Sequence, residues 1–186
     1  SYYPLTGVSS KLAFDGVTLQ ADEAAVYDFL TYYCELDLKS TTFRGNGKST
    51  GLYAYQPRAL QAVGTKLTGH GGWAAMVYAH DVPNLKATFH TCTIGDNGYG
   101  VYVYGATGSN VAMKNTSLEN NKYYGYYFQN CDLMFDSTTL TQWNVKGSYY
   151  PLTGVSSTLK FQDVTIQSDD AASYDFLTYY CDLDLK

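Results

Sequence analysis

The sequence is organised around a short motif whose first copy is LAFDGVTL, residues 12–19. Apolar or small residues occupy its first, third, sixth and eighth positions, and such alternation is typical of short β-strands. The change of phase between the third and sixth positions predicts a bend that joins two strands. Further copies begin at Leu36, Leu60, Ala87, Val111, Leu133 and Leu159, and a truncated copy begins at Leu183. Their starts are 22 to 27 residues apart, so a unit of about 24 residues recurs along the chain.

A longer repeat contains these units. Residues 1–39 recur as residues 148–186 with 30 of 39 positions identical, which gives a period of 147 residues that holds six units. A unit of this size cannot bury its apolar face alone, so it must stack on its neighbours. We therefore expect residues 1–186 to form one continuous β-solenoid, in which 1–39 and 148–186 are equivalent.

Several units carry a third strand-like stretch that is rich in tyrosine: GLYAY at 51–55, GVYVY at 100–104 and GYYF at 125–128. Tyr, Val and Phe favour extended backbone. Strand alternation places one set of side chains inside the coil, namely Leu52, Ala54, Val101, Val103, Tyr126 and Phe128. It places another set outside, namely Tyr53, Tyr55, Tyr102, Tyr104 and Tyr127.

The outward tyrosines permit two interpretations. Rings stacked one coil apart are candidates for a strip that binds glycans or proteins, because a phenol is both apolar and hydrogen-bonding. The alternative is that they only stabilise the stack. Alternation leaves open the direction of Tyr27, Tyr78, Tyr149 and Tyr150. Trp73 and Trp143 are expected in turns, where they would either extend such a strip or pack against the sides of the solenoid.

A polar side chain recurs ten residues after the start of most units, at Asp22, Asn46, His70, Asn97, Asn121 and Asp169. Asn and Asp tolerate left-handed backbone and bond to nearby amides, which explains one such turn. Recurrence at the same place in successive coils predicts more, namely a ladder of turn side chains stacked about 4.8 Å apart.

The motifs L-x-F-x-x-V/T-T-L and G-V/L-Y resemble those of right-handed parallel β-helices of the pectin-lyase-like kind, especially tandem-repeat versions in adhesin-like microbial surface proteins. The resemblance covers nearly the whole chain. It implies an all-β, right-handed parallel β-helix with about 24–25 residues per coil and about seven coils. It also implies an extracellular or cell-surface location, with any targeting signal outside these residues.

Composition argues against several partners. With 12 Lys+Arg against 17 Asp+Glu the chain is acidic, so no basic surface favours nucleic acid, and no apolar run is long enough for membrane insertion.

The spacing of Cys34, Cys92, Cys131 and Cys181 predicts unpaired, mostly buried thiols, since two coils separate the nearest equivalent pair. His70, His80 and His90 fall on different edges of the coil, so we expect no metal and no cofactor.

The function expected from these features is mechanical. An array without a clustered set of carboxylates or arginines predicts a rigid stalk, spacer or fibre rather than an enzyme. Its partners would be neighbouring repeats, or copies stacked end to end through unpaired strand edges, with cell-surface glycans as further candidates. Less favoured alternatives are a polysaccharide-degrading enzyme and an ice-binding protein. The second rests on an outward row of mostly hydroxyl side chains at Thr18, Thr42, Lys66, Thr93, Ser117, Thr139 and Thr165.

Overall fold

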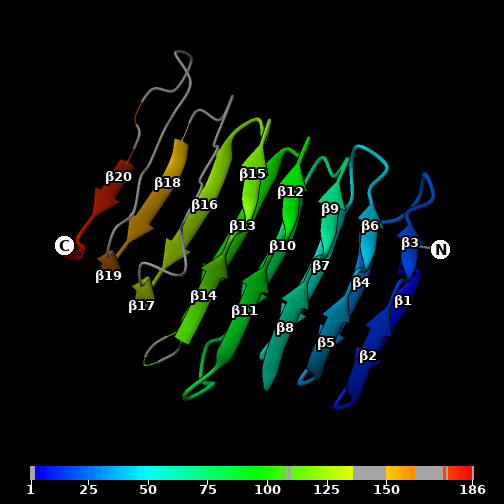
Figure 1. Cartoon of the computed structure of the whole chain (residues 1–186), viewed down its shortest axis with the longest axis horizontal. Coiled ribbons are helices and arrows are strands. Elements are labelled where there is room, and N and C mark those ends of the chain that lie inside the picture. The colour runs from blue at the N-terminus through cyan, green and yellow to red at the C-terminus, as the bar shows by residue number, and fades with distance from the viewer. Residues whose placement is uncertain are drawn as a thin grey trace.

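The computed structural model describes residues 3–106, 108, 110–135, 150–161, 174 and 176–185, which form 21 β-strands and no helix (Figure 1). The largest sheet, here called the tyrosine sheet, contains β1 (Leu5–Val8), β4 (Tyr27–Tyr32), β7 (Thr50–Tyr55), β10 (Trp73–Tyr78), β13 (Tyr99–Tyr104), β16 (Tyr124–Gln129), β18 (Tyr150–Val155) and β20 (Phe176–Tyr179). The second sheet contains β2 (Lys11–Asp15), β5 (Glu35–Lys39), β8 (Ala59–Val63), β11 (Lys86–His90) and β14 (Asn110–Lys114). The third contains β3 (Thr18–Gln20), β6 (Thr42–Arg44), β9 (Lys66–Thr68), β12 (Thr93–Gly95) and β15 (Ser117–Glu119). A three-stranded sheet in the last coils contains β17 (Asp132–Phe135), β19 (Thr158–Phe161) and β21 (Asp182–Leu185).

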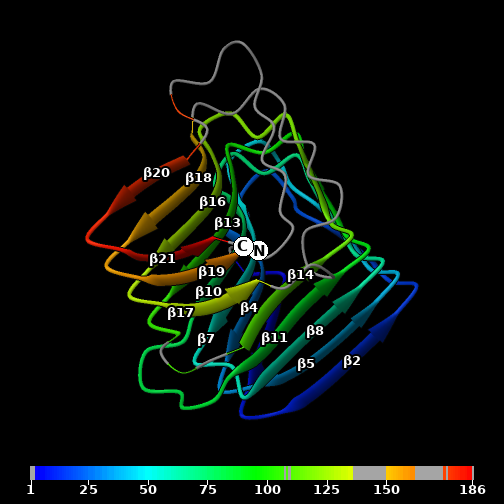
Figure 2. The same cartoon turned by 60° about the vertical axis from the view of Figure 1, so that its left-hand side comes forward.

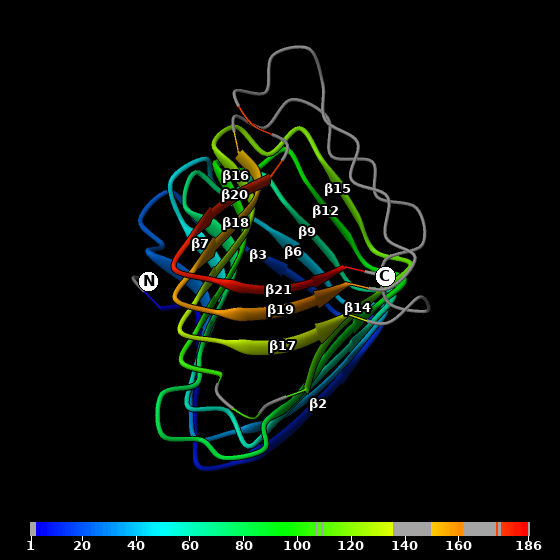
Figure 3. The same cartoon turned by 90° about the vertical axis from the view of Figure 1, so that its left-hand side faces the viewer.

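Every strand pair in the described residues is parallel, and within each sheet a strand pairs with its equivalents in the neighbouring coils. β14 and β17 belong to separate sheets, so strand pairing is interrupted between them. The chain therefore winds as a β-solenoid whose inter-coil hydrogen bonds run along the long axis, as the oblique view shows (Figure 2). Seen along that axis, the coils are roughly triangular (Figure 3). The all-β solenoid predicted from the sequence is confirmed. The predicted count of about seven coils was too high, because the structure has about six. The copy that begins at Leu183 supplies only β21.

Left-handed backbone residues make the bends between sheets. The bend from the second to the third sheet has a positive φ at Gly16, Ser40, Gly64, Thr91 and Asn115. The bend that leaves the tyrosine sheet has a positive φ at Ser9, Tyr33, Gln56, Asn130, Ser156 and Tyr180. One residue in this conformation turns the chain sharply, which accounts for the change of phase inside the sequence motif.

The core consists of apolar rows that run along the axis. Leu52, Ala54, Val101, Val103, Tyr126 and Phe128 all have 0% exposure, as alternation predicted. In register, Leu52 lies beside Ala75, which lies beside Val101, which lies beside Tyr126. Each coil thus buries its apolar side chains against the same positions of the next coil, which a single coil could not do.

The boundary between the two copies of the long repeat lies inside the tyrosine sheet. β16 belongs to the first copy and β18 to the second, and they pair with Tyr124 opposite Tyr150 and Tyr126 opposite Leu152. β17 and β19 pair in the same way across this boundary, with Leu133 opposite Leu159. Strand pairing is therefore continuous from one period into the next in both sheets.

Candidate functional site

The tyrosines predicted to point outward do so. Tyr53, Tyr55, Tyr102, Tyr104 and Tyr127 all stand on the outer surface of the tyrosine sheet, where each side chain is half-buried. Tyr27, Tyr78 and Tyr150, whose direction the sequence left open, also lie on this surface. Tyr149 and Trp143 lie outside the described residues. We call the outward side chains of this sheet the aromatic face.

One edge of the aromatic face is a row of stacked tyrosines. Tyr55 and Tyr78 stack with ring centroids 5.6 Å apart and planes 12° from parallel, and Tyr78 and Tyr104 stack at 4.5 Å and 20°. Tyr32 continues the row, 5.7 Å from Tyr55. The rings of Tyr55, Tyr78 and Tyr104 face one another, whereas the plane of Tyr32 is tilted by 56° from that of Tyr55. Each such ring pair adds stabilisation of about 0.5–1.5 kcal/mol between neighbouring coils.

A second group of rings surrounds Trp73, which opens β10 instead of lying in a turn as the sequence suggested. Its ring centroid is 4.9 Å from Tyr99, 5.3 Å from Tyr102, 6.2 Å from Tyr124 and 6.3 Å from Tyr127. These five residues are the Trp73 cluster. They come from three successive coils, so the indole of Trp73 contacts its own coil and the two coils that follow.

The aromatic face is electrically neutral. Burial among neighbouring rings raises the pKa of Tyr102 far above its usual range, with a further contribution from Tyr127. Burial also raises the pKa of Tyr53, Tyr78 and Tyr124. The phenols therefore stay protonated, and they offer hydroxyl donors and acceptors in place of charge. One is already engaged, since Tyr102 Oη donates to Gln129 Oε1 at 3.0 Å.

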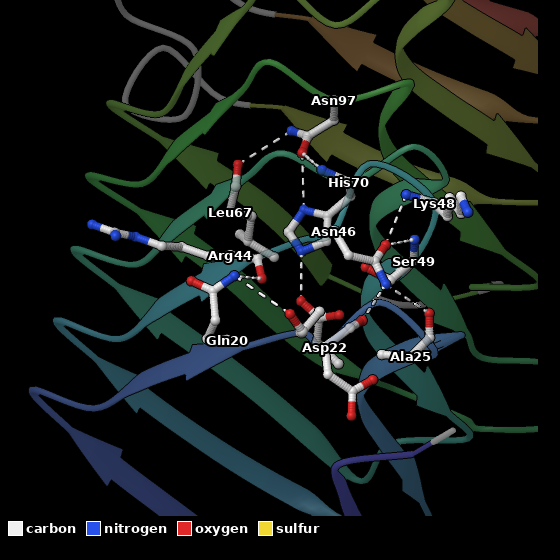
Figure 4. Close-up of polar contacts among 12 residues, drawn as sticks. Gln20, Asp22, Ala25, Arg44, Asn46, Lys48, Ser49, Leu67, His70 and Asn97 are labelled. Carbon is white, nitrogen blue, oxygen red and sulfur yellow. Dashed lines mark hydrogen bonds and ion pairs between the residues drawn. The ribbon is translucent and has the colours of Figure 1, made fainter. Parts of the chain in front are cut away.

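The turn ladder forms a separate site at a corner of the solenoid (Figure 4). At its half-exposed end, Asn46 Nδ2 donates to the carbonyl oxygens of Asp22 and Ala25 at 2.6 and 3.1 Å. Asn46 Oδ1 accepts from the backbone N–H groups of Lys48 and Ser49 at 2.8 and 2.7 Å. The side chain thus links its own turn to the turn of the preceding coil. Asp169 lies outside the described residues.

At its buried end the ladder becomes a chain of direct side-chain contacts. Asn97 Nδ2 donates to Asn121 Oδ1 at 3.0 Å, and Asn97 Oδ1 lies 2.9 Å from His70 Nδ1. His70 Nε2 is 2.9 Å from Asp28 Oδ2, and the two side chains are 0% and 1% exposed. Because Asn97 Oδ1 can only accept, His70 Nδ1 is the donor in this contact.

Sequence reasoning missed Asp28, the partner of His70. The signal was present, because the positions in register with Asp28 in the following coils are small residues, Gly51, Ala74, Gly100 and Gly125. The space above Gly51 holds the imidazole, since a Cβ built there would lie 2.8 Å from His70 Nε2. Because both residues are only 1% exposed, we interpret this pair as a structural contact between coils rather than a proton-transfer site.

The remaining candidates lie apart from one another. All four cysteines are free thiols, of which only Cys181 is not fully buried. Burial raises the pKa of the Cys92 thiol to about 11. His80 is in an exposed loop and His90 on the outer side of β11. The described residues contain no group of three or more side chains that could hold a metal ion, and no helix that could cross a membrane.

Comparison with known proteins adds no relative. No protein-family model matches the chain, and no curated protein or solved structure matches it either.

Proposed function

We propose that this chain is a rigid structural segment, a stalk, spacer or fibre element, of a tandem-repeat protein. The observation that supports the proposal is the unbroken strand pairing across the repeat boundary, from β16 to β18 and from β17 to β19. Because neighbouring periods pair strands in the tyrosine sheet and in the three-stranded sheet, these pairs oppose bending between the two periods. Six coils at about 4.8 Å each give a rise of about 29 Å per period.

We place the parent protein on the cell surface or in an extracellular fibre, with an adhesin-like architecture. The support is the sequence resemblance to pectin-lyase-like repeat proteins together with the solenoid fold. We also propose that the segment is not an enzyme. Outward charges on the second sheet are of mixed sign and some pair locally, as Lys11 does with Glu35 at 2.7 Å and Lys39 with Asp37 at 3.2 Å. Such pairs are typical of a solvated face.

The mechanical proposal is tested with chains of one, two and four periods. Small-angle scattering or sedimentation should detect rods of constant cross-section that lengthen by about 29 Å for each added period. A compact particle whose largest dimension does not grow with the number of periods would refute the proposal. Incubation with neutral and acidic polysaccharides tests the second part, because soluble cleavage products would show that the segment is an enzyme.

A further inference from the structure

Charge is distributed unevenly among the sheets. The outward side chains of the tyrosine sheet include no charged residue among the positions that the structure describes, and Asp28, the acidic residue of β4, is buried. Charged side chains lie on the second and third sheets instead, and they include Lys11, Glu35, Asp37, Lys39, Lys66, Lys86, Lys114 and Glu119. The aromatic face therefore suits an uncharged ligand, and an acidic or basic polymer would find no counter-charge there.

The Trp73 cluster provides a platform on this face. Upright rings two strands apart would be separated by about 9.6 Å. The centroids of Trp73 and Tyr124 are only 6.2 Å apart, so the indole leans along the axis toward the following coils. It lies within 34° of the planes of Tyr99, Tyr102 and Tyr124 and is half-buried, which leaves part of the indole open to solvent.

The stacked row provides hydroxyl groups beside this platform. Since the rings of Tyr55, Tyr78 and Tyr104 stack on one another, their edges rather than their faces are available to a ligand. The row ends near the loop after β10, where a cavity of about 420 Å³ is lined by His80, Asp81, Val82, Pro83 and Gly105. The His80 ring lies 6.1 Å from Tyr104, so this loop borders the aromatic face on one side.

We propose that the aromatic face binds a neutral polysaccharide that lies along the solenoid axis. Sugar rings have apolar C–H faces that suit the indole of Trp73, and hydroxyl groups that suit the protonated phenols of the stacked row. Successive coils repeat every 4.8 Å or so, close to the length of one sugar residue in an extended chain, so each coil meets a new residue. This binding function is independent of the mechanical one, and either can fail without the other.

Affinity electrophoresis of the whole chain tests the proposal, with mixed-linkage β-glucan, xylan and mannan as neutral probes and polygalacturonate and chitosan as charged controls. We expect retardation by at least one neutral polysaccharide and by neither control. Trp73→Ala should weaken that binding about tenfold, the size expected when one stacking contact is lost, while Trp73→Phe should retain part of it. Lys66→Ala, on the third sheet, is the matched control and should bind as the parent chain does.

Circular dichroism of each variant shows whether it is folded. If Trp73→Ala does not fold, Tyr102→Ala and Tyr104→Ala replace it, and Tyr104→Phe separates the hydroxyl from the ring. The proposal is overturned if no neutral polysaccharide retards the folded chain, if only a charged one does, or if folded aromatic variants bind unchanged. Lateral dimers abolished by Trp73→Ala, without polysaccharide binding, would overturn it by assigning the face to a second copy.

Discussion

Replacing Asn97 by alanine tests whether the buried end of the turn ladder holds successive coils together. Asn97 is 3% exposed and makes four hydrogen bonds through its side chain. Its Oδ1 accepts from the backbone N–H and Nδ1 of His70 at 3.0 and 2.9 Å. Its Nδ2 donates to the carbonyl of Leu67 at 3.2 Å and to Asn121 Oδ1 at 3.0 Å.

The expected loss follows from the two buried donors of His70 that would lose this acceptor. A buried donor without an acceptor costs about 1–3 kcal/mol, so Asn97→Ala should lower the free energy of unfolding by about 2–6 kcal/mol. In a chain of 186 residues this corresponds to a fall in melting temperature of roughly 5–20 °C. Urea unfolding followed by far-ultraviolet circular dichroism measures the loss directly.

Asn46→Ala is the matched control, because the same residue type occupies the same ladder position in an earlier coil. Asn46 is half-exposed, and two of the four backbone groups that it bonds, the Asp22 carbonyl and the Lys48 N–H, belong to exposed residues, so water can replace those bonds. Its loss should therefore cost less, about 1 kcal/mol. Equal losses for the two variants, or a larger loss for Asn46→Ala, would refute the argument that burial decides the strength of the ladder.

Four further perturbations follow from local structure. Gly51→Ala places a Cβ 2.5 Å from the carbonyl oxygen of Ala74, so we expect urea unfolding to report a loss above about 2 kcal/mol. Gly16 has φ +65° and nothing within 4 Å of an added Cβ, so Gly16→Asn should lower the free energy of unfolding by less than about 1 kcal/mol. A larger loss for Gly16→Asn than for Gly51→Ala would contradict this argument. Because burial raises the pKa of Cys92 from 9.0 to about 11, the unfolded chain loses this thiol proton before the folded chain does. The free energy of unfolding should therefore fall between pH 9.0 and about 11, and this thiol contributes at most about 3 kcal/mol of that fall. Cys92→Thr should remove this contribution. If the parent chain and Cys92→Thr lose stability equally over this pH range, the burial argument for Cys92 is wrong. A thiol reagent should label Cys181 well before Cys92, since only Cys181 is not fully buried, and simultaneous labelling would show that the coils open more freely than their packing indicates.

The sequence was sufficient for the fold and for most of the inward and outward assignments. Strict alternation around Leu52, Tyr53 and Ala54 defines the two sides of β7, and the structure agrees. Alternation failed at β10, whose sequence WAAMVY is apolar on both sides and therefore gives no contrast between core and surface. There, Tyr78 is oriented by its stacking partners in the neighbouring coils.

The buried end of the ladder could be predicted only in part. The spacing of Asn97 and Asn121 predicted stacked turn side chains, and they do bond to each other. The burial of His70 depends on Asp28, 42 residues earlier in the chain, and on the absence of a side chain at Gly51. A motif read within one coil does not reveal a contact that spans two coils, because coil spacing and side-chain reach decide it together.

The direction of the inter-coil hydrogen bonds has a consequence for a chain under load. Since they run along the long axis, a pull on the two ends stretches them lengthwise, and the outermost coil, held by one neighbour, yields first. Each coil of about 24 residues then releases roughly 80 Å of extended backbone. An array that resists bending would therefore lengthen under tension in nearly equal steps, absorbing energy coil by coil while the remaining coils stay folded.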